Sequence, residues 1–414
     1  MRTRILVAIV TGHLMGSAAA AQEWPRFRGA NGIGVSAAPL PARWTDKDYS
    51  WQVKLPGVGH SSPVLWGERL FVTSASAAKN VHVQCLHAAT GRVHWQRDFD
   101  AGAARGHKDN NLASATPAAD AERVYIAWGN AAAVVLVALT HDGRQVWRRD
   151  FGPYRAGHGF GSSPIVHDGL VILPCEHEGK DSLAAVDAAT GKDRWRVPRK
   201  SRNTYATPCV YQRGDRPAEL IAVSYEDGIT SLDPATGRRN WDVDVFDKRH
   251  AEGAIASPLI VNDLILGTAA WLSVRYESIA VRPGAGAARP ETVFKLDRDA
   301  PLVPTPVAKD GLLFLWSDRG IVSCCDAKTG ANVWRERVDG SFYASPVIAG
   351  DYVYCPSRTG EMFVLSASKK FEQVARVPLG EGTHAVPALA GGRMFVRTFG
   401  RVMCLDGQGV KKSE

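Results

Sequence analysis

The sequence predicts an all-β fold, an eight-bladed β-propeller whose blades are four-stranded antiparallel sheets. The first observation is a unit that recurs eight times: a small residue and a proline, then β-rich runs, then a glycine turn. The second is the spacing of these prolines, 40 to 54 residues, which suits one propeller blade. The third is that incomplete units stand at both ends of the repeat array. The prolines are Pro63, Pro117, Pro164, Pro208, Pro258, Pro306, Pro346 and Pro387.

Residues 1–21 have the pattern of a cleaved secretory signal. Arg2 and Arg4 precede a short apolar run, and an Ala-x-Ala site stands before Gln22. The run is shorter than the roughly 20 apolar residues that a membrane helix needs, and no other segment approaches that length. No cysteine follows the run, so we expect no lipid anchor. The sequence therefore predicts a soluble periplasmic or secreted protein without an integral membrane segment.

After the signal we expect an N-terminal extension over 22–48, the propeller over 49–407 and a short tail over 408–414. The stretch YSWQVKLPG, which begins at Tyr49, reads as a fourth strand with no preceding three. The last unit, RMFVRTFGRVMCLDG, stops at its turn without a fourth strand. Pairing the two would close the ring and cover the sheet edges that an open array exposes.

A glycine turn followed by tryptophan marks the outer strand of most units. HAATGRVHW, DAATGKDRW, DPATGRRNW, DAKTGANVW and the variant THDGRQVW all place tryptophan four positions after glycine. Aspartate bonds the backbone at the head of such a turn, and glycine supplies a positive φ. We expect the large flat indoles to dock neighbouring blades. The docking tryptophans are Trp51, Trp95, Trp147, Trp195, Trp241 and Trp334.

Two units depart from this pattern. SIAVRPGAGAARPETVF in the fifth unit and VLSASKKFEQVARV in the seventh lack both the Thr-Gly turn and the tryptophan. Either other contacts hold these blades together, or the ring is irregular there.

The adjacent cysteines Cys324 and Cys325 have two interpretations. They could form a vicinal disulfide at a redox centre, or they could be strand residues. They align with strand positions of the other units, and neighbours on a strand point to opposite faces. A disulfide between them would distort the backbone, so we expect buried packing. The seven cysteines show no CxxC or zinc-type spacing, and we expect no metal framework.

The candidate site lies in the loops that lead into the innermost strands, called the leading loops below. In a propeller these loops meet at one mouth of the central channel. One interpretation is a quinone, a metal or a small polar ligand held with imidazoles as ligands or proton acceptors. The other is that the side chains satisfy loop carbonyls and channel water. The candidates are His60, His107, Asp109, Asn110, Asn111, His158, Asn203, Tyr205, Glu252, Tyr343 and His384.

Charge and motif content exclude several classes of function. The net charge of +8 falls to +6 when Arg2 and Arg4 leave with the signal. The basic residues are scattered, so we expect no nucleic-acid partner. The chain has no G-x-S-x-G elbow of a serine hydrolase and no paired-carboxylate pattern of a glycosidase.

The repeated motif A/D-x-x-T-G-x-x-x-W resembles the tryptophan-docking repeats of the pyrroloquinoline quinone (PQQ) propeller superfamily. The resemblance runs from Trp51 to Gly407. That superfamily includes quinone-dependent dehydrogenases and non-catalytic scaffolds of the BamB type. The stretch WPRFRGANGIGVS is similar to exported PQQ-like propellers of planctomycete-type bacteria.

Three functions fit these observations. The favoured one is an exported, non-catalytic scaffold that binds a protein or envelope component at its channel mouth. The second is a PQQ-dependent dehydrogenase of alcohols or aldose sugars. It would need calcium, for which Glu252, Asn203 and Asp109 are only loosely suitable ligands, so PQQ with calcium is a candidate cofactor that we do not favour. The third is a carbohydrate-binding propeller.

Overall fold

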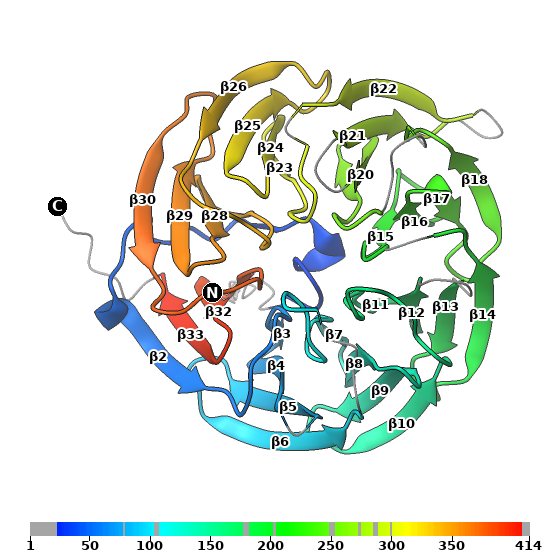
Figure 1. Ribbon diagram of the computed structural model, residues 1–414, viewed down its shortest axis with the longest axis vertical. Helices are drawn as coiled ribbons and strands as arrows, with labels where there is room; N and C mark the ends of the chain where they lie inside the picture. Colours follow the sequence, from blue (N-terminus) through cyan, green and yellow to red (C-terminus); the bar gives the residue numbers. More distant parts are fainter. Residues whose placement is uncertain are drawn as a thin grey trace, which may run out of the picture.

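The computed structural model is a closed ring of eight β-sheets around a central axis (Figure 1). It describes residues 23–407 except 78, 103–106, 177–181, 202–203, 248–252, 272–274, 285–288 and 299. Within these residues the helical content is two short 3-10 turns, η1 (Ala30–Gly32) and η2 (Asp46–Asp48). The predicted all-β, eight-bladed propeller is confirmed. None of the helices in this part of the chain has the length and apolar character of a membrane span.

Each blade is an antiparallel sheet whose strands follow chain order outward from the axis. Blade 1 consists of β3 (Val64–Trp66), β4 (Arg69–Ala75), β5 (Asn80–His87) and β6 (Val93–Asp100), and blade 2 of β7 (Ala118–Ala119), β8 (Arg123–Gly129), β9 (Val134–Thr140) and β10 (Gln145–Asp150). Blade 3 consists of β11 (Ile165–His167), β12 (Leu170–Cys175), β13 (Ser182–Asp187) and β14 (Asp193–Pro198), and blade 4 of β15 (Cys209–Tyr211), β16 (Glu219–Ser224), β17 (Gly228–Leu232) and β18 (Arg239–Val243). Blade 5 consists of β19 (Leu259–Val261), β20 (Leu264–Trp271), β21 (Arg275–Arg282) and β22 (Glu291–Leu296). Blade 6 consists of β23 (Val307–Lys309), β24 (Leu312–Trp316), β25 (Ile321–Asp326) and β26 (Asn332–Arg337). Blade 7 consists of β27 (Val347–Ala349), β28 (Tyr352–Pro356), β29 (Glu361–Ser366) and β30 (Gln373–Pro378).

Blade 8 combines the two ends of the repeat array. β31 (Ala388–Ala390), β32 (Arg393–Arg397) and β33 (Arg401–Asp406) are followed outward by β2 (Tyr49–Lys54), which pairs antiparallel with β33. In Figure 1 the blue β2 lies beside the red β33. Trp51 stands opposite Cys404, the register that places tryptophan opposite Cys85 in blade 1.

The hydrophobic pattern explains why the second and third strands lie in the interior. β12 and β13 are buried along nearly their whole length, because both of their faces pack against neighbouring blades. The outer strand β14 is exposed except at alternate positions such as Trp195. The core is therefore a series of clusters between blades.

A belt of hydrogen bonds joins the innermost part of the blades. In each link the backbone N–H of the residue before the repeat proline donates to the hydroxyl of the equivalent residue in the next blade, over 2.9 to 3.4 Å. Seven of the eight links are present, and every belt residue is buried. The belt residues are Ser62, Thr116, Ser163, Thr207, Ser257, Thr305, Ser345 and Val386.

The belt is interrupted where blade 7 meets blade 8. Val386 occupies the belt position of blade 8, and its own N–H donates to Ser62 Oγ over 3.0 Å. Valine has no hydroxyl, so it offers no acceptor to the N–H of Ser345.

Tryptophan docking follows one geometric rule. The indole of one blade lies on the turn glycine of the next blade, so that a Cβ added to Gly91, Gly143 or Gly191 would lie 2.6 to 2.7 Å from the indole. The indole N–H donates to a turn carbonyl of that next blade, as Trp147 does to Ala188 O over 3.0 Å. Trp51, Trp95, Trp195 and Trp334 make the equivalent bond. At Gly91, Gly143 and Gly191 the φ is positive and any side chain would meet the indole, so these turns need glycine. The blade 7 turn that accepts the Trp334 bond has no glycine, and Phe371 lies against that indole.

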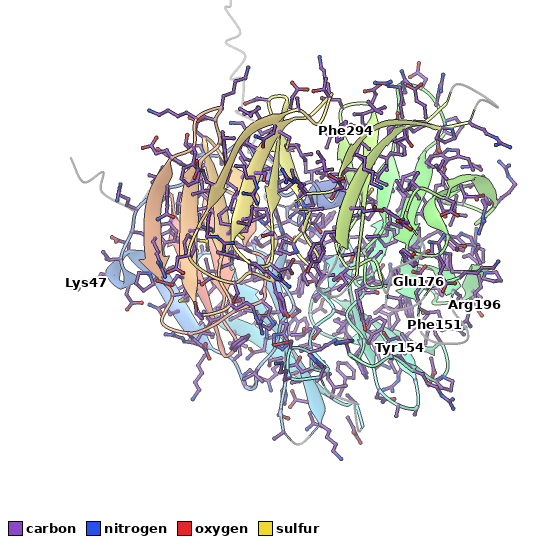
Figure 2. The ribbon with its side chains drawn as sticks, turned by 45° about the horizontal axis from the view of Figure 1, so that its top comes forward. Lys47, Phe151, Tyr154, Glu176, Arg196 and Phe294 are labelled. Atoms are coloured by element: carbon purple, nitrogen blue, oxygen red, sulfur yellow. The ribbon has the colours of Figure 1, made fainter. Side chains whose placement is uncertain are left out.

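The two irregular units keep four strands each and replace the tryptophan differently. In blade 5, Phe294 (Figure 2) packs on Gly330 of blade 6. In blade 7 the equivalent position is Ala375. The rest of the blade 8 turn lies outside the described residues, and Pro39 and Leu40 of the N-terminal extension approach Gly407.

Trp241 departs from the docking pattern. Its indole N–H donates to Glu219 Oε2 of its own blade over 2.7 Å. Residues 285–288 of the next blade, where the partner turn is expected, lie outside the described residues.

The cysteine pair lies on β25 with its side chains on opposite faces. Cys324 packs with Trp334 and blade 7, whereas Cys325 packs with Leu266 and blade 5. Both are buried thiols outside any disulfide, and burial raises the pKa of Cys324 to about 12. The alternation expected for strand residues is observed.

The N-terminal extension enters the central channel. Trp24 pairs with Leu65 of blade 1, and β1 (Val35–Ser36) adds to β27 as a parallel fifth strand. Between them, η1 lies at the centre of the ring in Figure 1. Asn31 bonds both backbone groups of Val210 in blade 4. Residues 24–36 therefore contact blades on opposite sides of the axis.

Val386→Thr should stabilise the protein, because the new hydroxyl would accept the N–H of Ser345 and complete the belt. We expect the free energy of unfolding to rise by about 1 kcal/mol in urea denaturation. The matched control Thr116→Val removes an existing acceptor and leaves the buried Ser62 N–H unpaired, which should cost about 1 to 3 kcal/mol. A Val386→Thr protein less stable than the native one would contradict the belt account.

Gly191→Ala and Gly169→Ala should differ in cost although both glycines have φ near +70°. A Cβ at Gly169 meets nothing within 4 Å, whereas one at Gly191 lies 2.7 Å from Trp147. The left-handed backbone alone costs about 1 to 2 kcal/mol. Displacing the indole should add about 1 to 3 kcal/mol for Gly191→Ala alone. Equal losses in thermal unfolding would show that the indole contact adds nothing.

Candidate functional site

A cavity of about 490 Å³ occupies the mouth of the channel where the leading loops meet. It is lined by two stacked rings of residues, because side chains two apart in an extended segment point the same way. One ring is the eight belt residues. The other is the residue two positions before each of them: His60, Ser114, Gly161, Tyr205, Ile255, Val303, Tyr343 and His384.

Phe27 lines the cavity from the N-terminal extension. The segment that carries it, residues 24–36, bonds the inner strands of several blades. The channel is therefore blocked by its own chain, and the cavity is a cup that opens toward the leading loops.

Eight of the eleven residues expected from the sequence line this cup: His60, His107, Asp109, Asn110, His158, Tyr205, Tyr343 and His384. Asn111 does not line it. Its side-chain oxygen accepts the N–H of Ala113 and its amide donates to Val58 O, so it shapes its own loop. Asn203 and Glu252 lie outside the described residues.

Sequence reasoning missed Arg358, which comes from the turn between β28 and β29. Antiparallel strands place the turn between the second and third strands at the same end of the blade as the leading loop. The signal is a short Ser-x-x-Gly turn: Ser357 and Gly360 bracket Arg358, and Asp318 holds the equivalent position in blade 6. A search restricted to the leading loops misses the turns between the second and third strands, which also reach the mouth.

Arg358 is the centre of the polar contacts in the cup. Its guanidinium lies over the Tyr343 ring, 4.0 Å from the ring centroid. Its Nη2 forms an ion pair with Asp109, and its Nε donates to His384 Nε2 over 3.4 Å. Asp109 belongs to the leading loop of blade 2, so this ion pair joins blade 2 to blade 7 at the mouth.

Two imidazoles stack on one side of the cup. The rings of His60 and His384 lie 4.7 Å apart at 18°, and Phe399 meets both edge-on. Burial, with smaller contributions from neighbouring positive charge, lowers the pKa of His60 to about 3 and that of His384 to about 4; Arg358 contributes at both rings. Both rings are therefore neutral at neutral pH.

A second imidazole pair lies beside Asp109. The ring centroids of His107 and His158 are 4.4 Å apart, and His107 Nδ1 is 3.8 Å from Asp109 Oδ2. The N–H of Asp109 donates to His107 Nδ1 over 3.3 Å, which fixes the ring against its own loop.

Three buried arginines lie behind the lining of the cup, each bonded to a backbone carbonyl next to a belt residue. Arg28 donates to Pro306 O and Pro346 O over 2.7 and 2.8 Å, and Arg26 donates to Pro208 O over 2.6 Å. Arg397 donates to Ser61 O over 2.7 Å. Burial lowers the pKa of Arg28 and Arg397 to about 9 and that of Arg26 to about 10.

The described residues of the cup do not fit PQQ with calcium. Calcium takes roughly six to eight oxygen ligands, several of them carboxylates. Asp109 is the one carboxylate among the described residues that line the cup, and Arg358 holds it. In that part of the chain no group of three or more His, Cys, Asp or Glu could hold a metal ion. Asn203 and Glu252, the other expected ligands, are not described.

The family model described as outer membrane protein assembly factor BamB matches residues 45–245, 131–300 and 229–408. The chain belongs to this PQQ-like propeller family. Outer membrane protein assembly factor BamB of Yersinia pestis is 22% identical over 401 residues, covering 80% of this chain and 92% of that protein.

Dehydrogenases are also similar to this propeller. Polyvinylalcohol dehydrogenase of a Pseudomonas species is 30% identical over 180 residues, which are 40% of this chain and 26% of that protein. The match thus spans about a quarter of that enzyme. The structure of quinohemoprotein alcohol dehydrogenase from Comamonas testosteroni has a TM-score of 0.67 at 14% identity, covering 96% of this chain and 82% of that one. This second likeness concerns the fold alone.

Substitutions of the central ion pair should move the pKa of His384 in opposite directions. Arg358→Gln removes a positive charge that disfavours the imidazolium, so the pKa should rise from about 4 toward, but not to, its ordinary value, because burial remains. Asp109→Asn removes a stabilising negative charge and should lower it. An NMR titration of the histidine ring signals measures both, and shifts of the same sign would contradict the described geometry.

Proposed function

We propose that this protein is an exported, non-catalytic scaffold that binds a protein segment or envelope component in the cup at its channel mouth. The observation that carries the proposal is the cup itself, closed below by residues 24–36 and lined by side chains that already pair with one another. A cavity of about 490 Å³ with aromatic walls suits the side chains of a partner segment.

The protonation states of the cup support binding more than catalysis. A general base works best with a pKa near the working pH. His60 and His384 have pKa values far below neutrality, and the Asp109 carboxylate is held by Arg358. These groups are suited to fixed hydrogen bonds, and Arg358 makes a cation–π contact with Tyr343.

The relatives also favour a binding scaffold over an enzyme. The match with the assembly factor covers nearly all of that protein, whereas the match with polyvinylalcohol dehydrogenase covers about a quarter of the enzyme. The apparent signal over residues 1–21 would place the propeller in the periplasm, where such a partner would be met.

Site-specific photo-crosslinking in the native envelope tests the proposal. A photoreactive residue at Lys108, on the rim of the cup, should capture a reproducible partner. The matched position is Lys328, in a turn at the opposite end of blade 6, which should not capture it. The purified partner should then bind with about tenfold lower affinity to Tyr343→Ala and unchanged affinity to Tyr352→Ala, whose ring lies at the opposite end of blade 7.

Two outcomes would overturn the scaffold. Equal capture from Lys108 and Lys328 would show that the cup is not the binding surface. A saturable absorbance change on adding PQQ and calcium, together with dye reduction by alcohols or aldose sugars, would establish a dehydrogenase instead.

A further inference from the structure

Positive charge gathers around the cup, and among its buried arginines a neighbouring carboxylate, Glu381, acts on Arg397. Arg28, Arg26 and Arg397 are at most 7% exposed, and their hydrogen-bond acceptors among the described residues are carbonyl and hydroxyl oxygens. None of the ion pairs between described residues involves these three arginines. A buried cation is costly unless an anion or a full set of acceptors compensates it. Arg26 Nε and Arg397 Nη2 are buried without an acceptor among the described residues. The lining adds Arg358 and Lys108.

Asp109 behaves as a tethered carboxylate in this field. It reaches the blade 7 guanidinium from the leading loop of blade 2, and its side chain is only 16% exposed. The loop has its own internal bonds, from the Asn110 N–H to His107 O and from the Ala113 N–H to Asn111 Oδ1. These bonds do not involve Arg358, so the loop keeps its internal hydrogen bonds when another carboxylate replaces Asp109 on Arg358.

The Arg358 guanidinium can bind an entering carboxylate. A guanidinium has five N–H groups in a planar fork, which matches the two oxygens of a carboxylate. Among the described residues, one N–H of Arg358 bonds His384 and one bonds Asp109. The Arg358 guanidinium packs on the Tyr343 ring, and the Arg358 side chain remains 30% exposed.

We propose that the cup binds a carboxylate group, which docks on Arg358 in exchange for the Asp109 carboxylate. This inference rests on the proposed function and names the chemistry of its partner: an acidic side chain or a chain-terminal carboxylate enters the cup. Lys108 lies on the rim to attract it, and the buried arginines stabilise it from below. Asp109 keeps Arg358 paired until the partner arrives, which limits binding to ligands that compete with a tethered group.

Acetate and acetamide form a matched pair of probes, because they have nearly the same shape and differ in charge. Titration is followed by the NMR ring signals of His60 and His384, which lie beside Arg358. Acetate should shift these signals saturably and acetamide should not. Asp109→Asn removes the internal competitor and should tighten acetate binding on the order of tenfold.

Charge-removing variants locate the binding group. Arg358→Gln should abolish the acetate response. Arg358→Lys keeps the charge without the fork and should retain weaker binding. Arg319→Gln, in the equivalent turn one blade earlier and outside the lining, should respond as the native protein does. Thermal melting confirms that each variant is folded.

The outcomes separate this inference from the scaffold. Equal responses to acetate and acetamide, weaker acetate binding by Asp109→Asn, or an unchanged response of folded Arg358→Gln would overturn it. If Asp109→Asn also increases crosslinking from Lys108, the partner supplies the carboxylate; if crosslinking is unchanged while acetate binds, the source is a small molecule. Acetate binding without any crosslinked partner would leave the carboxylate site standing and overturn the scaffold.

Discussion

The belt of hydroxyl-to-amide hydrogen bonds around the channel sets the geometry on which the site depends. Each belt residue precedes the proline that begins an inner strand, so the belt fixes the point where a leading loop becomes a strand. The residue two positions earlier then faces the cup in every blade, as His60 does in blade 1 and Tyr343 in blade 7. Eight loops of different sequence thereby place one residue each at the equivalent position of the ring, Gly161 in blade 3 among them. Loop variation can change the chemistry of the cup while the belt keeps its shape.

At the outer rim of the ring a different interaction, tryptophan docking, also joins each blade to the next. An indole of one blade lies on a turn glycine of the next, and its N–H reaches a turn carbonyl, so each contact fixes both distance and orientation. Blade 5 lacks tryptophan but keeps the contact through Phe294, whereas blade 7 has Ala375 at the equivalent position. The ring therefore tolerates loss of the motif where another apolar group fills the same space.

The N-terminal extension turns a channel into a cup. Arg28 inserts between blades 6 and 7 and bonds carbonyls of both, while Asn31 bonds blade 4, so the segment ties together inner strands that are far apart in sequence. Arg26 and Arg28 of this segment also place positive charge beneath the cavity. Structure and electrostatics of the site are thus coupled: the residues that block the channel also favour an anion above it.

The sequence by itself determined the fold, the number of blades and most of the cup, because these follow from a local repeat. A proline before each inner strand and a glycine turn before most outer strands are short-range signals that need no knowledge of contacts. They placed His60 and His384 at the mouth and set Cys324 and Cys325 on opposite faces of one strand. Only the tertiary structure decided that residues 24–36 fill the channel, that Arg358 joins the site from a second set of turns, and that Asp109 crosses from blade 2 to pair with it. These are contacts between residues as much as 318 positions apart, as between Arg28 and Pro346. No periodic pattern encodes them, since they arise only when the ring closes.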